Sequence, residues 1–322
     1  MINIISKSII SKNIRGPQKV VNNLINGLNL IGYPYIINQR LDATKRLWIH
    51  DDKNAFKKIS KLPSYIHTLA GPNLFLIPQE IPETLSLPRT IYLQPSENTK
   101  KVWLEKGYNK SPVEVWPAGI NIPLSQPCIE ERKKILVYFK QREQKELETV
   151  INILVKLNLN YNIIKYGSYY EKEYQKKMNE SKYIIWLGCY ESQGIALLEA
   201  LSSNIPILVI DKEPESKWEM KSTSAPYFND QCGIKIKDFE SLSEKISFME
   251  KQWTIFKPKK YIEENLSLAK QARDFIFFYE KHFNLSFEEG LKEKIIKKGK
   301  WINATFLFKI YILLKDTVKN YI

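Results

Sequence analysis

The sequence has few of the residues that bind metals or form disulfides, with three cysteines and three histidines among 322 residues. Cys128, Cys189 and Cys232 are odd in number and lack the spacing of a metal site, so we expect buried thiols in a reducing compartment. No apolar run reaches the roughly 18 residues that a transmembrane helix needs. The apolar residues 1–5 are too few for a signal peptide, and we expect a first strand there. These absences predict a cytoplasmic protein.

Acidic residues are scarce relative to basic ones, 35 against 49, and the formal net charge is +14. This balance predicts an anionic partner, which could be nucleotide phosphates, an anionic membrane surface or nucleic acid. A nucleic-acid-binding protein is expected to show a basic face with interleaved aromatic residues, or a known binding module. Neither is evident in the sequence, so we predict no nucleic-acid partner.

Short apolar segments rich in β-branched residues alternate with segments of helical spacing, which predicts doubly wound α/β domains with parallel sheets. The length suffices for two domains. We expect an N-terminal domain of residues 1–122, a second domain of residues 123–284 and a tail of residues 285–322. The expected strands include residues 2–5, 33–38, 47–50, 90–94, 134–139, 161–166, 183–187, 205–210 and 233–236. The expected helices include residues 20–31, 53–61, 143–157, 170–180, 239–251 and 261–284.

Residues 190–201 join two of the expected strands and carry the clearest chemical signal in the chain. Gly194 opens a run of good helix formers, and the backbone N–H groups of Gly194, Ile195 and Ala196 would form an anion site at the helix N-terminus. Glu191 precedes this helix and Glu199 lies within it. Carboxylates accept hydrogen bonds from the vicinal hydroxyls of sugars. The alternative is that both glutamates are ordinary solvated charges, and the apolar residues around Glu199 weaken it.

Residues 191–200, followed by the segment 204–207, resemble the E-x7-E signature of the GT4 family of retaining glycosyltransferases. The resemblance implies GT-B architecture, in which two Rossmann-like domains face each other across a cleft. It also implies that the donor sugar contacts Glu191, that the loop approaches the donor, and that Glu199 holds the ribose. The loop positions carried over are Ser192, Gln193, Gly194 and Ile195, with Gln193 standing where the family usually has an aromatic residue.

Basic residues follow the expected strand 134–139. Lys140, Arg142 and Lys145 could reach a pyrophosphate, and the alternative is a solvated basic turn. The GT4 resemblance places a diphosphate-binding Arg/Lys pair directly after this strand. Gly16, between the first strand and first helix, is either part of an ordinary βα turn or, by the resemblance, part of a loop that faces donor and acceptor.

The resemblance is incomplete in the first domain, because Ala70 occupies the position of a histidine that contacts the donor sugar in the family. His67 precedes it on the expected strand. His50, beside Asp51 and Asp52, is a candidate for a polar site, although a structural histidine with satisfied hydrogen bonds is an equal alternative.

The C-terminal tail combines lysines between positions 292 and 300 with an apolar and aromatic stretch from Trp301 to Leu314. This pattern predicts an interfacial helix that binds anionic lipid on the cytoplasmic membrane face. The alternative is a helix packed on the body of the protein.

We therefore expect a retaining glycosyltransferase that moves a sugar from a nucleotide sugar to a saccharide, such as a surface glycan or a lipid-linked one. No cofactor is expected, and the sequence has no Asp-x-Asp motif for a metal. One alternative is a nucleotide-sugar epimerase, which would need several site histidines where only His50, His67 and His282 are available. Another is a nucleotide-sugar binder without catalytic activity.

Overall fold

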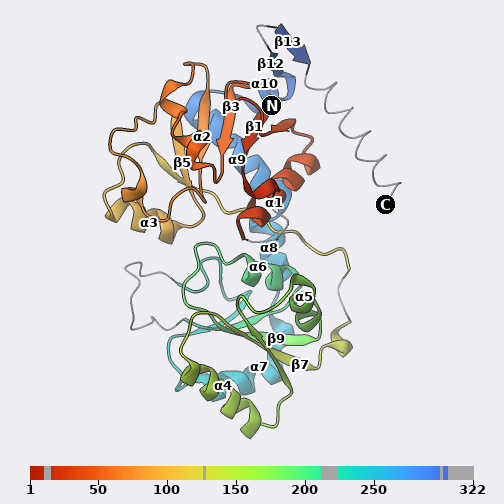
Figure 1. Ribbon diagram of the computed structural model, residues 1–322. Coiled ribbons are helices and arrows are strands. Elements are labelled where there is room, and N and C mark those ends of the chain that lie inside the picture. Colours follow the sequence, from red (N-terminus) through yellow and green to blue (C-terminus); the bar gives the residue numbers. More distant parts are fainter. Residues whose placement is uncertain (11–15, 126–127, 212–222, 298–299, 304–322) are drawn as a thin grey trace. The chain divides into compact units, whose positions relative to one another are not determined.

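The computed structural model describes residues 1–10, 16–125, 128–211, 223–297 and 300–303 (Figure 1). The chain forms two compact units, one of Met1–Gly119 together with the chain from Leu268 onward, and one of Ile120–Ser267. The sequence places the corresponding boundaries after residues 122 and 284. In the structure the chain returns to the first unit at Leu268, because the helix that begins there packs on the first sheet.

The first unit contains a six-stranded parallel sheet in the order β2-β1-β3-β4-β5-β6. Its strands are β1 (Ile2–Ile5), β2 (Tyr35–Ile37), β3 (Arg46–Ile49), β4 (His67–Ala70), β5 (Thr90–Gln94) and β6 (Val113–Val115). Its helices are α1 (Gly16–Leu30), α2 (Lys53–Phe56), α3 (Glu97–Glu105), α9 (Leu268–Phe283) and α10 (Phe287–Lys292). Phe56 of α2 and Trp103 of α3 pack in the core on one face. On the other face Phe275 of α9 meets Trp48 of β3 at 5.2 Å between ring centroids.

The second unit contains a five-stranded parallel sheet in the order β11-β10-β9-β7-β8. Its strands are β7 (Lys134–Phe139), β8 (Tyr161–Lys165), β9 (Ser181–Leu187), β10 (Ile207–Ile210) and β11 (Gly233–Ile236). Its helices are α4 (Gln144–Lys156), α5 (Glu171–Asn179), α6 (Ile195–Ser202), α7 (Leu242–Gln252) and α8 (Pro258–Asn265). Helices α5, α6 and α8 cover one face, and α4 and α7 cover the other. The central strands are buried on both faces, which explains their continuous apolar sequences.

The register of this sheet places several strand ends at the same level. Phe139 at the end of β7 pairs with Lys165 of β8 and with Leu187 of β9. Since the strands are parallel, the residues that follow them emerge at one edge of the sheet, where open α/β sheets bind ligands. Lys140, Tyr166 and the loop that contains Glu191 all lie at this edge.

Three predicted helices differ from the structure. The expected helix 261–284 is divided into α8 and α9, and Ser267 between them forms an isolated bridge to Ile120. The expected helix 53–61 is the short α2 followed by a 3-10 turn. Trp301, predicted to begin an interfacial helix, lies instead in the hairpin of β12 (Lys294–Lys297) and β13 (Lys300–Asn303). The rest of that predicted helix lies outside the described residues. Among the described residues, no helix is both long and apolar enough to cross a lipid bilayer.

Candidate functional site

The loop after β9 turns into helix α6 through Gly194, whose backbone is left-handed at φ 79°. A residue with a Cβ adopts this conformation at a cost, which explains glycine here. Leu197, Leu198 and Leu201 bury one side of α6 in the core. The first bond within the helix runs from Leu198 N to Gly194 O (3.0 Å). The preceding amides are therefore not used by the helix itself and give its N-terminus a positive electrostatic character.

Two predicted site residues, Lys140 after β7 and Glu191 after β9, meet beside the start of α6. This place, made of Lys140 and residues 190–196, is called the corner below. Lys140 Nζ lies 2.7 Å from Glu191 Oε1, and the two side chains are only 14% and 12% exposed. Burial raises the pKa of the Glu191 carboxyl, while the charge of Lys140 and its hydrogen bond oppose the rise. Lys140 Nζ also lies 4.5 Å from the centroid of the Tyr166 ring. The edge thus holds a cation that is already positioned beside a carboxylate.

The second glutamate of the motif, Glu199, lies on α6 and is half-buried. Its charge is close enough to Tyr174 of α5 to add to the effect of burial in raising the pKa of that phenol. Tyr174 is itself fixed by a hydrogen bond that its hydroxyl donates to Ala196 O (2.8 Å). Glu199 therefore lies near Tyr174 of α5, about one turn into α6 from the loop that carries Glu191.

The other predicted cations lie differently. The Arg142 side chain is 2% exposed and pairs with Glu146, Nε to Oε2 at 2.7 Å. Its guanidinium also donates to Gly188 O (3.3 Å), beyond the end of β9. The Lys145 side chain is 77% exposed and pairs with Glu143 at 2.7 Å. Of the three cations, the structure brings Lys140 to Glu191 and turns Arg142 inward.

The remaining predicted positions of the corner differ in burial. Ser192 is exposed, whereas Gln193 is buried. In the first unit, Gly16 is the first residue of α1 and is exposed. Ala70 is the last residue of β4 and is fully buried, so its methyl group offers no polar contact to a ligand.

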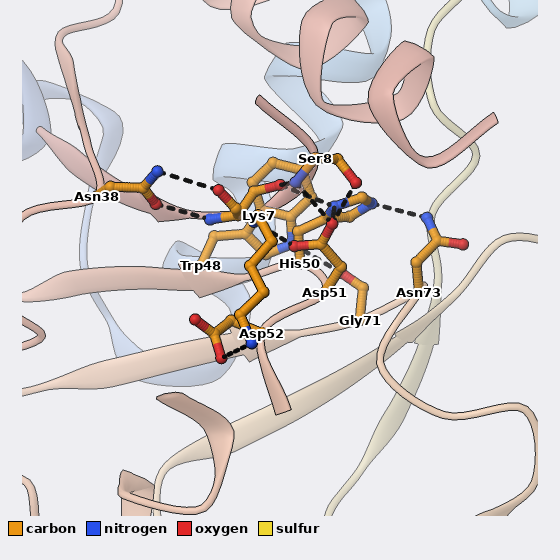
Figure 2. A network of polar contacts seen from close by, with 10 residues as sticks. Lys7, Ser8, Asn38, Trp48, His50, Asp51, Asp52, Gly71 and Asn73 are labelled. Carbon is orange, nitrogen blue, oxygen red and sulfur yellow. Dashed lines mark hydrogen bonds and ion pairs between the residues drawn. The ribbon is translucent and has the colours of Figure 1, made fainter. Parts of the chain in front are cut away.

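His50 lies in a separate buried network at the carboxyl edge of the first sheet (Figure 2). Its Nε2 lies 2.7 Å from Asn73 Nδ2, and its Nδ1 lies 3.4 Å from Ser6 Oγ and 3.6 Å from Asp51 Oδ2. Asp51 also accepts hydrogen bonds from the backbone amides of Lys7 (2.8 Å) and Ser8 (3.0 Å). Burial lowers the pKa of His50. Both ring nitrogens therefore have partners, in a network that fixes the chain after β1.

The sequence did not identify three residues that support the loop of Glu191, namely Asp211, Thr223 and Ser224. Asp211 directly follows β10, and its carboxylate accepts hydrogen bonds from Thr223 Oγ1 (2.6 Å) and Ser224 N (2.7 Å). Burial alone would raise the pKa of Asp211, but these hydrogen bonds outweigh it and the pKa is lowered. Thr223 O in turn accepts from Glu191 N (3.1 Å). Asp211 thereby helps to fix the backbone of Glu191, and its place after a buried strand was a usable signal.

A metal site is not evident in the part of the chain that the structure describes. There, no three side chains of His, Cys, Asp or Glu are grouped so that they could hold an ion. The positive groups at the corner are instead Lys140 and the N-terminus of α6.

Solved structures share this fold at low sequence identity. Sucrose-phosphate synthase from Thermosynechococcus elongatus aligns with 88% of this chain and 99% of its own, at 11% identity and a TM-score of 0.58. The lipopolysaccharide outer core galactosyltransferase WaaB aligns with 86% of this chain and 99% of its own, at 13% identity and a TM-score of 0.54. Anabaena HepE, in complex with UDP and glucose, aligns with 87% and 99% of the two chains, at 9% identity and a TM-score of 0.54.

No protein-family model and no curated protein sequence matches the chain. The two parallel-sheet α/β units and these structural neighbours show that the protein has the GT-B fold, as the sequence predicts.

Proposed function

We propose that the protein is a retaining glycosyltransferase that moves a sugar from a nucleotide-sugar donor to a saccharide acceptor. The observation that carries the proposal is the contact between Lys140 and Glu191 at the N-terminus of α6, in the second unit of a GT-B fold. Fold alone does not determine function. The argument therefore rests on what this corner can do chemically.

A nucleotide sugar presents a diphosphate between its ribose and its transferred sugar. Lys140 and the amides at the start of α6 supply a cation and aligned N–H groups, which together suit a phosphate. In the proposal they stabilise the negative charge that develops as the nucleoside diphosphate leaves. These groups and the lack of an Asp-x-Asp motif lead us to propose that the reaction needs no metal.

Glu191 is proposed to contact the donor sugar and to stabilise the positive charge that develops at its ring. The bond between the anomeric carbon and the phosphate oxygen breaks, and the acceptor oxygen bonds to that carbon on the same face. The acceptor proton passes to an oxygen of the leaving phosphate, so no protein nucleophile is needed. Glu199 is proposed to accept hydrogen bonds from the ribose hydroxyls.

The proposed acceptor is a surface glycan, free or lipid-linked, and the proposed location is the cytoplasm or the cytoplasmic membrane face. The structural neighbour WaaB is described as a lipopolysaccharide outer core galactosyltransferase. The net charge of +14 would favour approach to an anionic membrane.

The test is to incubate the protein with individual nucleotide sugars and oligosaccharides and to follow both products. A transferase releases nucleoside diphosphate and yields a glycoside, whose anomeric configuration can be read by NMR against that of the donor. A glycoside of inverted configuration would contradict the retaining mechanism.

The same experiment separates the two alternatives. An epimerase would change the configuration of the nucleotide-bound sugar, with transient release of the diphosphate at most. A silent binder would bind donor and release nothing under any condition. Where activity is seen, the Glu191→Gln variant is the control for activity that does not arise at this site.

A further inference from the structure

At the carboxyl ends of the strands of the second sheet lies an exposed aromatic ring that has no role in the proposed function. Tyr166 directly follows β8, and its side chain is 54% exposed although it lies beside buried charged residues. Lys140 Nζ lies 4.5 Å from the centroid of its ring. An aromatic ring with so much free surface next to a proposed phosphate site is a candidate for ligand stacking.

The position of Tyr166 is fixed by the sheet. Its backbone N donates to Phe139 O (2.9 Å), and Lys140 N donates to Leu187 O (2.8 Å). The segments that follow β8, β7 and β9 are thus tied together side by side, in the order of the sheet. A ligand that stacks on Tyr166 would therefore meet a residue whose backbone is already ordered, which lowers the entropic cost of binding.

The side chains at the carboxyl ends of these three strands follow the same order as the sugar, diphosphate and base of a nucleotide sugar. Glu191 follows β9, Lys140 follows β7 and Tyr166 follows β8, with neighbouring strands about 4.8 Å apart. If the sugar lies at Glu191 and the diphosphate at Lys140, the chain of the donor continues toward β8, which is an edge strand. The nucleobase then comes within reach of Tyr166.

We propose that Tyr166 is the stacking platform for the nucleobase of the donor. The cation of Lys140 lies over the Tyr166 ring and helps to hold the ring in position. The exposed surface of the ring receives the planar base. Every base has an aromatic face, so stacking gives affinity without selecting one base. The proposal rests on the proposed function, because it takes the donor to be a nucleotide sugar.

The experiment compares nucleoside diphosphates with pyrophosphate, which has no base. UDP, GDP and ADP are titrated by calorimetry into the wild type, Tyr166→Leu and Tyr166→Phe, and the diphosphate that binds is compared with pyrophosphate. Tyr170→Leu is the matched control, because Tyr170 belongs to the same loop and is 86% exposed. Each substitution is at the surface, so unchanged melting temperatures are expected.

We expect Tyr166→Leu to weaken nucleoside diphosphate binding by about tenfold or more, from the usual effect of removing a stacked aromatic ring. Pyrophosphate binding should be unchanged, and both Tyr166→Phe and Tyr170→Leu should bind like the wild type. Equal losses for both ligands would overturn the inference, since Tyr166 would then act only by positioning Lys140. Unchanged binding of the nucleoside diphosphate by Tyr166→Leu would also overturn it. A wild type that binds none of the diphosphates would contradict the proposed function itself.

Discussion

Lys140 Nζ lies 2.7 Å from Glu191 Oε1, although the two residues follow different strands and are 51 positions apart. Burial works against the charge of Glu191, and Lys140 compensates for part of that cost. Removing two charged side chains from water in this way has a large desolvation cost. In the proposed function, the donor phosphate engages Lys140 and the donor sugar engages Glu191, so each partner of the pair has a role.

The two glutamates of the motif should have different effects on kinetics. Glu191 would face charge that develops as the glycosidic bond breaks, so Glu191→Gln should lower kcat by ~10²-fold or more. Glu199 would contact a ribose that is bound alike in the ground and transition states, so Glu199→Gln should mainly raise the donor KM. Steady-state kinetics on both variants, with matched melting profiles, measure this. Full turnover by Glu191→Gln would remove residues 190–201 from the donor-sugar site.

Arg142 should matter for stability more than for ligand binding. Its side chain is 2% exposed and pairs with Glu146. Arg142→Met would leave Glu146 without this partner and should lower the free energy of unfolding by about 2–4 kcal/mol. Lys145→Met, which alters an exposed lysine nearby, should change it by less than ~0.5 kcal/mol. Urea denaturation tests both. If Arg142→Met kept its stability and lost diphosphate binding, Arg142 would have to turn toward the ligand.

His50 should make the stability of the protein fall in mild acid. Burial lowers its pKa in the folded state from the usual 6.5. Below pH 6.5 the unfolded chain therefore takes up a proton that folded His50 does not, and the free energy of unfolding decreases as pH falls. His67 has a lowered pKa too, while the raised pKa of Glu191 acts in the opposite direction.

Because these groups overlap, the informative quantity is the difference between variants. His50→Gln should be less stable than the wild type at neutral pH and should lose less stability between pH 7.5 and pH 5.5, with His67→Gln measured alongside as the comparison. The same loss in His50→Gln as in the wild type would show that His50 is not responsible.

The C-terminal tail can be removed at a position that the structure defines. Glu293 is buried, pairs with Arg46 and accepts a hydrogen bond from Lys45 N (2.7 Å), so the chain up to this residue belongs to the core of the first unit. Protein that ends after Glu293 should keep its melting profile and nucleotide binding but lose binding to anionic vesicles. Sedimentation with anionic and neutral vesicles measures this, and equal binding by both forms would favour a packed tail.

The sequence predicted the sheets well, because their central strands are continuous apolar runs bounded by breakers. It also predicted that a helix begins after Gly194, since a glycine followed by good helix formers is a local pattern. It could not predict that Arg142 turns inward, because Arg142 and Lys140 look alike in sequence and only the carbonyl of Gly188 and the carboxylate of Glu146 distinguish them. The division between α8 and α9 was also missed, since both have helical spacing and only the packing of α9 on the first sheet separates them.

The central claim is that Lys140 and the start of α6 form a nucleoside diphosphate site. Its most direct test is calorimetric titration of UDP, GDP, ADP and CMP into the wild type, Lys140→Met and the control Lys145→Met. At least one diphosphate should bind the wild type and Lys145→Met alike. It should bind Lys140→Met about tenfold or more weakly, as expected for losing one charge-assisted hydrogen bond. Binding of none of these nucleotides, or equal binding by the wild type and a folded Lys140→Met, would contradict the claim.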